Sequence, residues 1–226
     1  MPLPRRAAAG HRCRMLERMN TRRLSFFAPR WFGLPLLLAA MLVLGACQRS
    51  PLPLRLTNVS GHMPDLDFNL TDDSGKAVTG ADYRGKVVLL YFGYTHCPDV
   101  CPLTLAQLHV VMQRLGPQAE GARILFVSVD PARDTPAVLK AYVNAFDPRA
   151  VGLTGTPRAV EALSKRYRSA FTREPGGSDD TYAVSHSSAI YVFDRAGRAR
   201  VLATPSASHD DLVHDLKLLL DDGATS

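Results

Sequence analysis

Two cysteines placed where a strand turns into a helix constrain this chain more than any other feature. The apolar run Val87–Phe92 predicts a buried strand, and a helical spacing of apolar residues begins near Cys101. Cys97 and Cys101 are one helical turn apart, so both sulfurs can face the same side. Because a helix start favours negative charge, we expect lowered thiol pKa values here. Such a pair can close into a disulfide or hold a soft metal ion.

Strand-like and helix-like segments alternate along residues 62–222. Apolar or alternating runs predict strands at 65–70, 87–92, 124–129, 151–155, 189–193 and 200–203. Helices are predicted after Cys101, from Thr135, from Thr156 and around 212–219, the second and third opening with a hydroxyl residue and a proline. This order predicts an α/β fold. Together with the position of the thiols, it resembles the thioredoxin-like three-layer sandwich, in which helices flank a central mixed sheet.

The N-terminal part has the layout of an export signal. A basic flank containing Arg22 and Arg23 precedes an apolar stretch, 31–46, and the sequence Leu44–Cys47 resembles the lipobox of bacterial lipoproteins. The resemblance implies cleavage before Cys47 and lipidation of that residue. The alternative is an uncleaved anchor helix, although the apolar run is short for a span of about 20 residues. We therefore expect a signal peptide at 1–46, a lipidated N-terminus and tether at 47–61, and one domain at 62–222.

Removing the signal changes the charge argument. Residues 1–46 hold eight of the 27 basic residues and one of the 21 acidic residues, so 19 basic and 20 acidic residues remain in 47–226. The mature chain is therefore almost neutral, and its charge gives no reason to expect nucleic-acid binding. Besides Cys47, only Cys97 and Cys101 remain in it. One close pair in a domain of this size indicates working thiols more than a structural staple.

A metal site needs at least one further ligand, and histidine is the first candidate. His109 lies eight residues beyond Cys101, about 12 Å along a helix, and so cannot join the pair. His96 adjoins Cys97 but should point elsewhere. His186 lies just before the strand at 189–193, at a junction that would face the cysteine loop in a thioredoxin-like sheet. Solvated side chains are the default expectation for His62, His209 and His214.

Four segments resemble the signatures of the Sco/SenC family, in the same order along the chain. They are Phe92-Gly-Tyr-Thr-His-Cys-Pro-Asp-Val-Cys-Pro102, Val129-Asp-Pro-Ala-Arg-Asp-Thr-Pro136, Gly152-Leu-Thr-Gly-Thr156 and Val184-Ser-His-Ser187. The first resembles the copper-binding loop of that family almost residue for residue. The resemblance covers about residues 60–220. A lone CxxxC would be a weak signal, whereas the four segments together are specific.

The resemblance implies that Cys97, Cys101 and His186 bind one copper ion. Two thiolates suit Cu(I), and the imidazole helps to accommodate Cu(II). The implied role is to deliver copper to the copper-A site of cytochrome c oxidase subunit II, on the periplasmic side of the inner membrane, in contact with other periplasmic copper chaperones. Many members carry aspartate where this chain has Ser185, which puts the tuning of the histidine in question. Asp130 and Asp134 either border the site or cap the next helix.

Three alternative functions are compatible with these observations. The first is a membrane-tethered copper metallochaperone that needs all three ligands. The second is a thiol–disulfide oxidoreductase that reduces the target's cysteines with Cys97 and Cys101 as its redox pair and does not need His186. The third is a thiol peroxidase on the same fold, with Thr95 near one activated cysteine.

Overall fold

The computed structural model describes residues 52–174 and 182–222. Within them, eight strands form one mixed sheet in the order β1-β10-β9-β4-β5-β6-β2-β3. Their bounds are β1 Thr57–Asn58, β2 Asn69–Asp72, β3 Ala77–Thr79, β4 Val87–Gly93, β5 Ala122–Ser128, β6 Ala150–Thr154, β9 Ile190–Phe193 and β10 Ala199–Ala203. The segment expected as a signal, 1–46, Cys47 and residues 175–181 lie outside the described residues.

Four helices and a separate strand pair complete the described part of the chain. The helices are α2 Val100–Leu115, α3 Pro136–Asn144, α4 Pro157–Arg166 and α5 His209–Asp222, with short 3-10 turns η1 Gly80–Tyr83 and η2 Gly116–Gly121. The pair consists of β7 Phe171–Arg173 and β8 Val184–His186, joined antiparallel. The sequence pattern did not predict β1, β3 or this small pair, because each of them spans only two or three residues.

The centre of the sheet is parallel and its flanks are antiparallel. β4 pairs in parallel with β5, and β5 with β6, while β9 runs antiparallel to β4. Every residue of β4 is buried, as expected for a strand with both faces covered. This explains why Val87–Phe92 reads as one continuous apolar run. The expected mixed sheet flanked by helices is confirmed.

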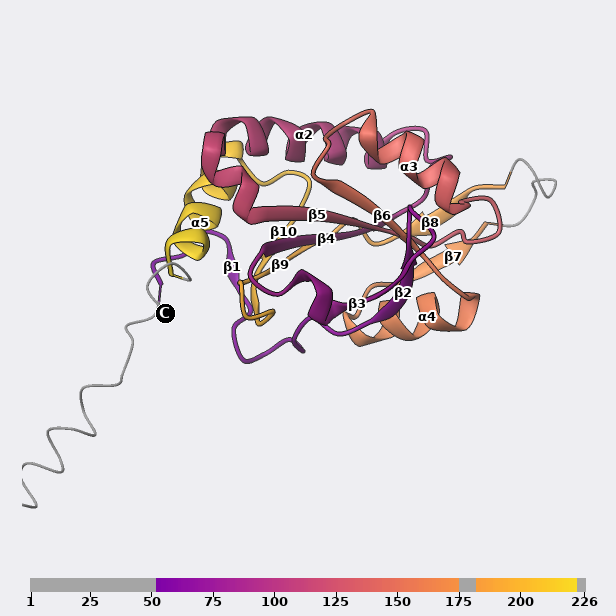
Figure 1. Cartoon of the computed structure of the whole chain (residues 1–226), viewed down its shortest axis with the longest axis horizontal. Coiled ribbons are helices and arrows are strands. Elements are labelled where there is room, and N and C mark those ends of the chain that lie inside the picture. The colour runs from indigo at the N-terminus through magenta and orange to yellow at the C-terminus, as the bar shows by residue number, and fades with distance from the viewer. Residues whose placement is uncertain (1–51, 175–181, 223–226) are drawn as a thin grey trace, which may run out of the picture. The chain divides into compact units, whose positions relative to one another are not determined.

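Two apolar cores lie on opposite faces of the sheet, which gives the three layers visible in Figure 1. One core joins alternate β4 residues to α2, α3 and α5, through side chains such as Leu105, Leu139 and Leu216. The other joins the remaining β4 residues to β2, β3 and α4, through side chains such as Leu70 and Val160. The metal-ligating candidates lie at the end of the sheet where β4 and β5 terminate.

Two helices begin as the sequence predicts. Thr135 accepts a hydrogen bond from Val138 N, and Thr156 accepts one from Ala159 N, and a proline follows each threonine. The hydroxyl satisfies one of the free N–H groups at a helix start, and proline has no such group to satisfy. Thr135, rather than Asp134, therefore caps α3.

The described part of the segment expected as a tether differs from that expectation. Leu52, Leu54 and Leu56 pack against the core beneath α5, and β1 adds to the edge of the sheet. The buried carboxylate of Asp215 accepts hydrogen bonds from the backbone N–H groups of Arg55 and Leu56. Partial burial of these leucines and the backbone hydrogen bonds stabilise this segment against the domain. Among the described residues, no helix has both the length and the apolar character that a membrane span requires.

A buried carboxylate fixes the turn between α3 and β6. Asp147 is fully buried and accepts two side-chain hydrogen bonds from Arg149, at 2.8 and 2.7 Å, and one from His109 Nδ1 at 2.9 Å. Burial by itself raises the pKa of Asp147, but the hydrogen bonds from Arg149 and His109 outweigh it and lower that pKa. The hydrogen bond from His109 thus joins α2 to the turn before β6.

We expect Asp147→Asn to lower the free energy of unfolding by about 3 kcal/mol at pH 7, because it removes the charge of a fully buried carboxylate that accepts hydrogen bonds from Arg149 and His109. Since the folded pKa of Asp147 is depressed, its contribution is present above the unfolded pKa, near 3.9, and is lost as the pH falls through the folded value. Urea unfolding at pH 7 and in a series down to pH 3 should show the gap closing. The exposed Asp210, paired with Arg114, provides the control: Asp210→Asn should change stability by less than about 1 kcal/mol.

Candidate metal centre

The cysteines are positioned by the junction between β4 and α2. Cys97 lies in the connecting loop, half-buried, and Cys101 is the second residue of α2 and is fully buried. Cys97 N donates to Tyr94 O at 3.2 Å, which turns the loop back toward the strand. Cys101 N in turn donates to Cys97 Sγ at 3.5 Å. Both thiols are free in this structure. The strand–helix junction predicted from the sequence is confirmed.

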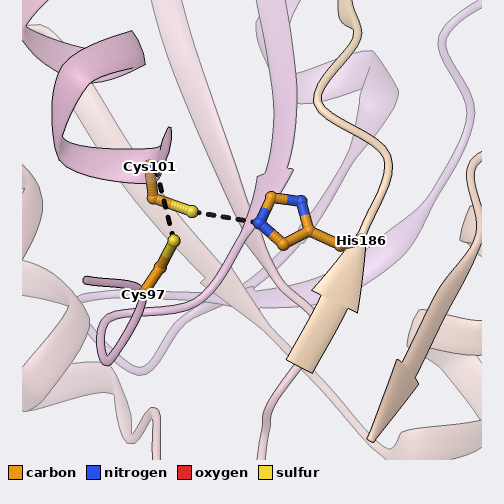
Figure 2. A group of neighbouring side chains, drawn as sticks. All are labelled: Cys97, Cys101 and His186. Atoms are coloured by element: carbon orange, nitrogen blue, oxygen red, sulfur yellow. Dashed lines mark hydrogen bonds between the residues drawn. The ribbon is translucent and has the colours of Figure 1, made fainter. Parts of the chain in front are cut away.

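The histidine comes from a distant part of the chain. His186 ends β8, opposite Phe171 in β7, and its Nε2 lies 3.2 Å from Cys101 Sγ. The two sulfurs and the imidazole nitrogen all lie within 4.8 Å of one another. Figure 2 shows the three side chains pointing toward a common point, Cys97 from the loop before α2, Cys101 from the first turn of α2 and His186 from β8. The structure therefore brings together the three residues singled out in the sequence.

The backbone sets the orientation of the imidazole. His186 Nδ1 lies 3.0 Å from the carbonyl oxygen of Ser187. A carbonyl only accepts hydrogen bonds, so Nδ1 carries the proton and Nε2 presents its lone pair to the sulfurs. Burial lowers the pKa of His186, which keeps the ring neutral and able to bind a metal. Ser185 is exposed and pairs with Thr172. The carbonyl of Ser187 thus supplies the orienting contact that was in question at Ser185.

Two tyrosines enclose the histidine and one of the thiols. The rings of Tyr91 and Tyr94 meet the His186 ring edge-on, with centroids 6.1 and 5.9 Å away. Tyr91 Oη donates to Cys101 Sγ at 3.7 Å. The pattern of the sequence did not single out these tyrosines. Their positions at the end of β4, three and six residues before Cys97, are a signal that could have placed them beside the cysteines.

The expectation of a lowered thiol pKa is wrong for Cys101. Burial raises the pKa of Cys101 to about 12, and this effect exceeds the favourable contribution of a hydrogen bond from the backbone at Tyr94. The side chain of Cys101 points into the core from the first turn of α2, so desolvation outweighs the helix-start effect. Without a metal, Cys101 is therefore a neutral thiol at physiological pH.

The donor set fits a soft metal ion. Two cysteine sulfurs and one imidazole nitrogen suit copper and also zinc, whereas magnesium and calcium prefer oxygen. In this structure the thiol of Cys101 contacts the lone pair on His186 Nε2, so all three donor atoms already face one another. Little rearrangement of the chain is needed for these atoms to surround one ion.

The other candidates lie outside this group of donors. His96 is exposed and its Nδ1 contacts Thr95 Oγ1 at 3.1 Å. His109 contacts Asp147, as described above, which confirms that it cannot join the cysteines. Asp130 and Asp134 are buried near the site and bond to residues on either side of it.

Gly93 leaves the space that Cys101 occupies. A Cβ atom at Gly93 would lie 2.8 Å from Cys101 Sγ and 2.6 Å from the ring of Phe126. We expect Gly93→Ala to lower the free energy of unfolding of the metal-free protein by about 1–3 kcal/mol, because the thiol and a buried ring must both move. Urea unfolding measures this loss.

Gly155→Ala is the matched control for that substitution. Its new Cβ would meet the flexible tip of Leu70 at 2.8 Å and Ala159 at 3.7 Å. Since such a tip can rotate away, we expect a smaller loss of stability than for Gly93→Ala. Equal losses would contradict the close fit of Cys101 against Gly93.

The comparisons with known proteins agree with this geometry. The copper-bound ScoI of Bradyrhizobium japonicum superimposes with a TM-score of 0.64 at 39% identity, covering 69% of this chain and 98% of that one. Yeast Sco1 with copper bound gives a TM-score of 0.63 at 34% identity, covering 68% and 87% of the two chains.

A curated relative covers a smaller share of this chain. The mitochondrial SCO2 homolog of Bos taurus is 44% identical over 133 residues, which is 58% of this chain and 50% of that protein. The alignment thus reaches only about half of the relative's length. The family model described as SCO1/SenC matches residues 61–221, the greater part of the sequence. This chain therefore belongs to the SCO1/SenC family.

Proposed function

We propose that this protein is a copper metallochaperone. It binds one copper ion through Cys97, Cys101 and His186 and delivers it to the copper-A site of cytochrome c oxidase subunit II. The observation that carries the proposal is the convergence of two thiols and one oriented imidazole within 4.8 Å. Support comes from family membership and from the copper bound in the two solved relatives described above. The oxidase as the receiving partner is what the sequence resemblance implies.

The three proposed ligands differ in burial, and we assign them different roles in holding and releasing the metal. Cys101 is fully buried, and His186 presents its Nε2 lone pair from β8, so these two residues form the buried side of the site. Cys97 is half-buried in the loop and is the ligand through which a partner's thiols can reach the site. A soft ion suits such a site because thiolates are soft ligands that select Cu(I). Loading releases the Cys101 proton.

We place the protein on the periplasmic side of the inner membrane, held by a lipid on Cys47. The lipobox-like sequence Leu44–Cys47 supports this location. Because the described chain is already packed from Leu52 onward, only residues 48–51 separate the proposed anchor from the folded part, a reach of about 14 Å. The anchor thus keeps the domain close to the membrane, in reach of a membrane-bound oxidase and of other periplasmic copper chaperones.

Copper titration of the full chain tests the proposal, in a background in which Cys13→Ser and Cys47→Ser remove the other two cysteines. We expect one copper per chain and a thiolate-to-Cu(II) absorption band. His186→Ala should weaken the band and lower the copper affinity by more than about 100-fold. Loss of a residue that only orients a ligand already lowers metal affinity by about 10–100-fold, and His186 is itself a proposed ligand.

His96→Ala is the matched control for this measurement, because His96 adjoins Cys97 but is exposed and contacts Thr95 instead. It should bind copper as the parent does. Zinc is titrated in parallel, because the donor set also suits zinc. Absence of copper binding by the parent, or equal binding by His186→Ala, would refute the metallochaperone.

The two thiols also favour a second candidate, a thiol–disulfide oxidoreductase. Cys97 and Cys101 are free and their sulfurs lie within 4.8 Å of each other. In this reaction both thiols are oxidised to a disulfide, and two electrons and two protons pass to a disulfide of the partner. Reduction of the target's cysteines would precede copper entry, so the two functions can be steps of one process.

Reduction of a disulfide-bonded peptide by the metal-free chain separates the second candidate from the first. We expect Cys97→Ser and Cys101→Ser to abolish the reaction and His186→Ala to retain it within about threefold, because the imidazole is not a redox group. Equal loss in all three variants would contradict this candidate, because the metal-free reaction would then need the imidazole as well as the two thiols. A peroxidase is not favoured, since the Thr95 hydroxyl donates to Asp134 and burial raises the pKa of Cys101.

A further inference from the structure

One loop of the chain contacts both ligand-bearing segments without supplying a ligand. The linking loop, residues 128–135, runs from the end of β5 to the start of α3. Val129 N donates to Gly93 O at 2.8 Å, which continues the pairing of β4 with β5 up to the cysteine loop. Two of the loop's carboxylates, Asp130 and Asp134, are buried. Each of them bonds to a different half of the candidate metal centre.

Asp134 holds the cysteine side. Its carboxylate is fully buried, and Oδ2 accepts a hydrogen bond from Thr95 N at 3.1 Å. Oδ1 accepts a hydrogen bond from Thr95 Oγ1 at 2.6 Å. Thr95 lies two residues before Cys97, at the point where the chain leaves β4. A charged acceptor with two bonds to one residue fixes both the backbone and the side chain of that residue.

Asp130 holds the histidine side. One of its carboxylate oxygens accepts a hydrogen bond from Tyr182 Oη, and the other accepts one from Arg133 Nε at 2.5 Å. The ring of Tyr182 lies between the guanidinium groups of Arg133 and Arg173, at 3.6 and 3.7 Å. Tyr182 lies two residues before β8, the strand that ends in His186. Stacking and the hydroxyl bond together fix the position of that strand.

The two carboxylates are connected inside the loop. Ser128 Oγ donates to Asp134 Oδ2 at 2.6 Å and accepts from Asp130 N at 3.0 Å. Asp134 N also donates to Asp130 O at 3.0 Å. Because Thr135 already caps α3, Asp134 is not needed to start that helix. Asp134 and Asp130 therefore bond to the segments that precede Cys97 and β8.

We propose that the linking loop is a positioning device for the candidate metal centre, in which Asp134 sets the cysteine loop and Asp130 sets the histidine strand. The proposal rests on the proposed function for the identity of the site. Neither carboxylate contacts the cysteine sulfurs or His186 in the described structure, and both act through Thr95 and Tyr182. The loop thus fixes the distance between two ligand segments that are 85 residues apart in sequence.

The cysteine side is tested without metal, by the rate at which iodoacetamide alkylates Cys101 in the full chain carrying Cys13→Ser and Cys47→Ser. Cys101 is fully buried, so alkylation requires local opening of the loop. We expect Asp134→Asn and Thr95→Val each to raise this rate by about tenfold or more, the effect of losing hydrogen bonds to a charged group. Thr95→Ser, which keeps the hydroxyl, should restore the parent rate.

Asp147→Asn is the matched control, because it also removes a fully buried carboxylate, whose partners are Arg149 in the turn before β6 and His109, about 12 Å along α2 from Cys101. It should leave the Cys101 alkylation rate within about twofold of the parent under native conditions. If Asp134→Asn does not fold, Thr95→Val decides. A rate for Thr95→Val equal to the rate for Asp147→Asn would overturn the proposal for the cysteine side.

The histidine side is tested by amide hydrogen exchange of residues 182–187. Tyr182→Phe keeps the ring between the two arginines and removes only the hydroxyl that Asp130 accepts. We expect exchange in this segment to rise by about threefold or more, while Asp147→Asn leaves it unchanged. Unchanged exchange in Tyr182→Phe would overturn the proposal for the histidine side.

Copper titration of the same variants separates this proposal from the proposed function. If the parent binds copper, Thr95→Val and Tyr182→Phe should each shift the wavelength of the thiolate-to-Cu(II) band, and Thr95→Ser should leave it unchanged. A general loss of stability would not produce this pattern of shifts. A parent that binds no copper would refute the metallochaperone, and the alkylation and exchange rates would still decide the role of the loop.

Discussion

The complete burial of β4 is the constraint on which the rest of the structure depends. This strand is covered on both faces and pairs on both edges, with β5 and β9, so its end is fixed in three dimensions. The cysteine loop begins at that end. Along the strand, side chains that face α2, α3 and α5 alternate with side chains that face α4, so β4 contributes to both cores. A rigid base of this kind allows a short loop to hold two sulfurs in place without a disulfide.

The site combines burial with access. Burial raises the pKa of the Cys101 thiol and lowers that of His186, so these two groups are neutral without metal and leave no uncompensated charge in the core. Cys97 remains half-buried at the surface. The three donor atoms already face one another in this arrangement. The proposed role as a copper carrier needs this combination.

The sequence predicted much of the fold because most of its signals are local. The apolar run of β4, the threonine–proline starts of α3 and α4, and the apolar spacing of α2 each depend on residues near one another in the chain. The short strands β7 and β8 were not predicted, because three residues carry too little periodicity. Tyr182 and Asp130 meet over 52 residues, and no local pattern encodes such a pairing.

By itself, the sequence determined that two thiols lie one helical turn apart after a buried strand, and it indicated His186 as the third candidate ligand. Only the tertiary structure decided how these groups meet. It placed Ser187 O, rather than the side chain of Ser185, behind the imidazole. It also reversed the expected direction of the Cys101 pKa. The physical reason is that desolvation and hydrogen bonding depend on every element packed around a group, whereas spacing along the chain describes only its own element.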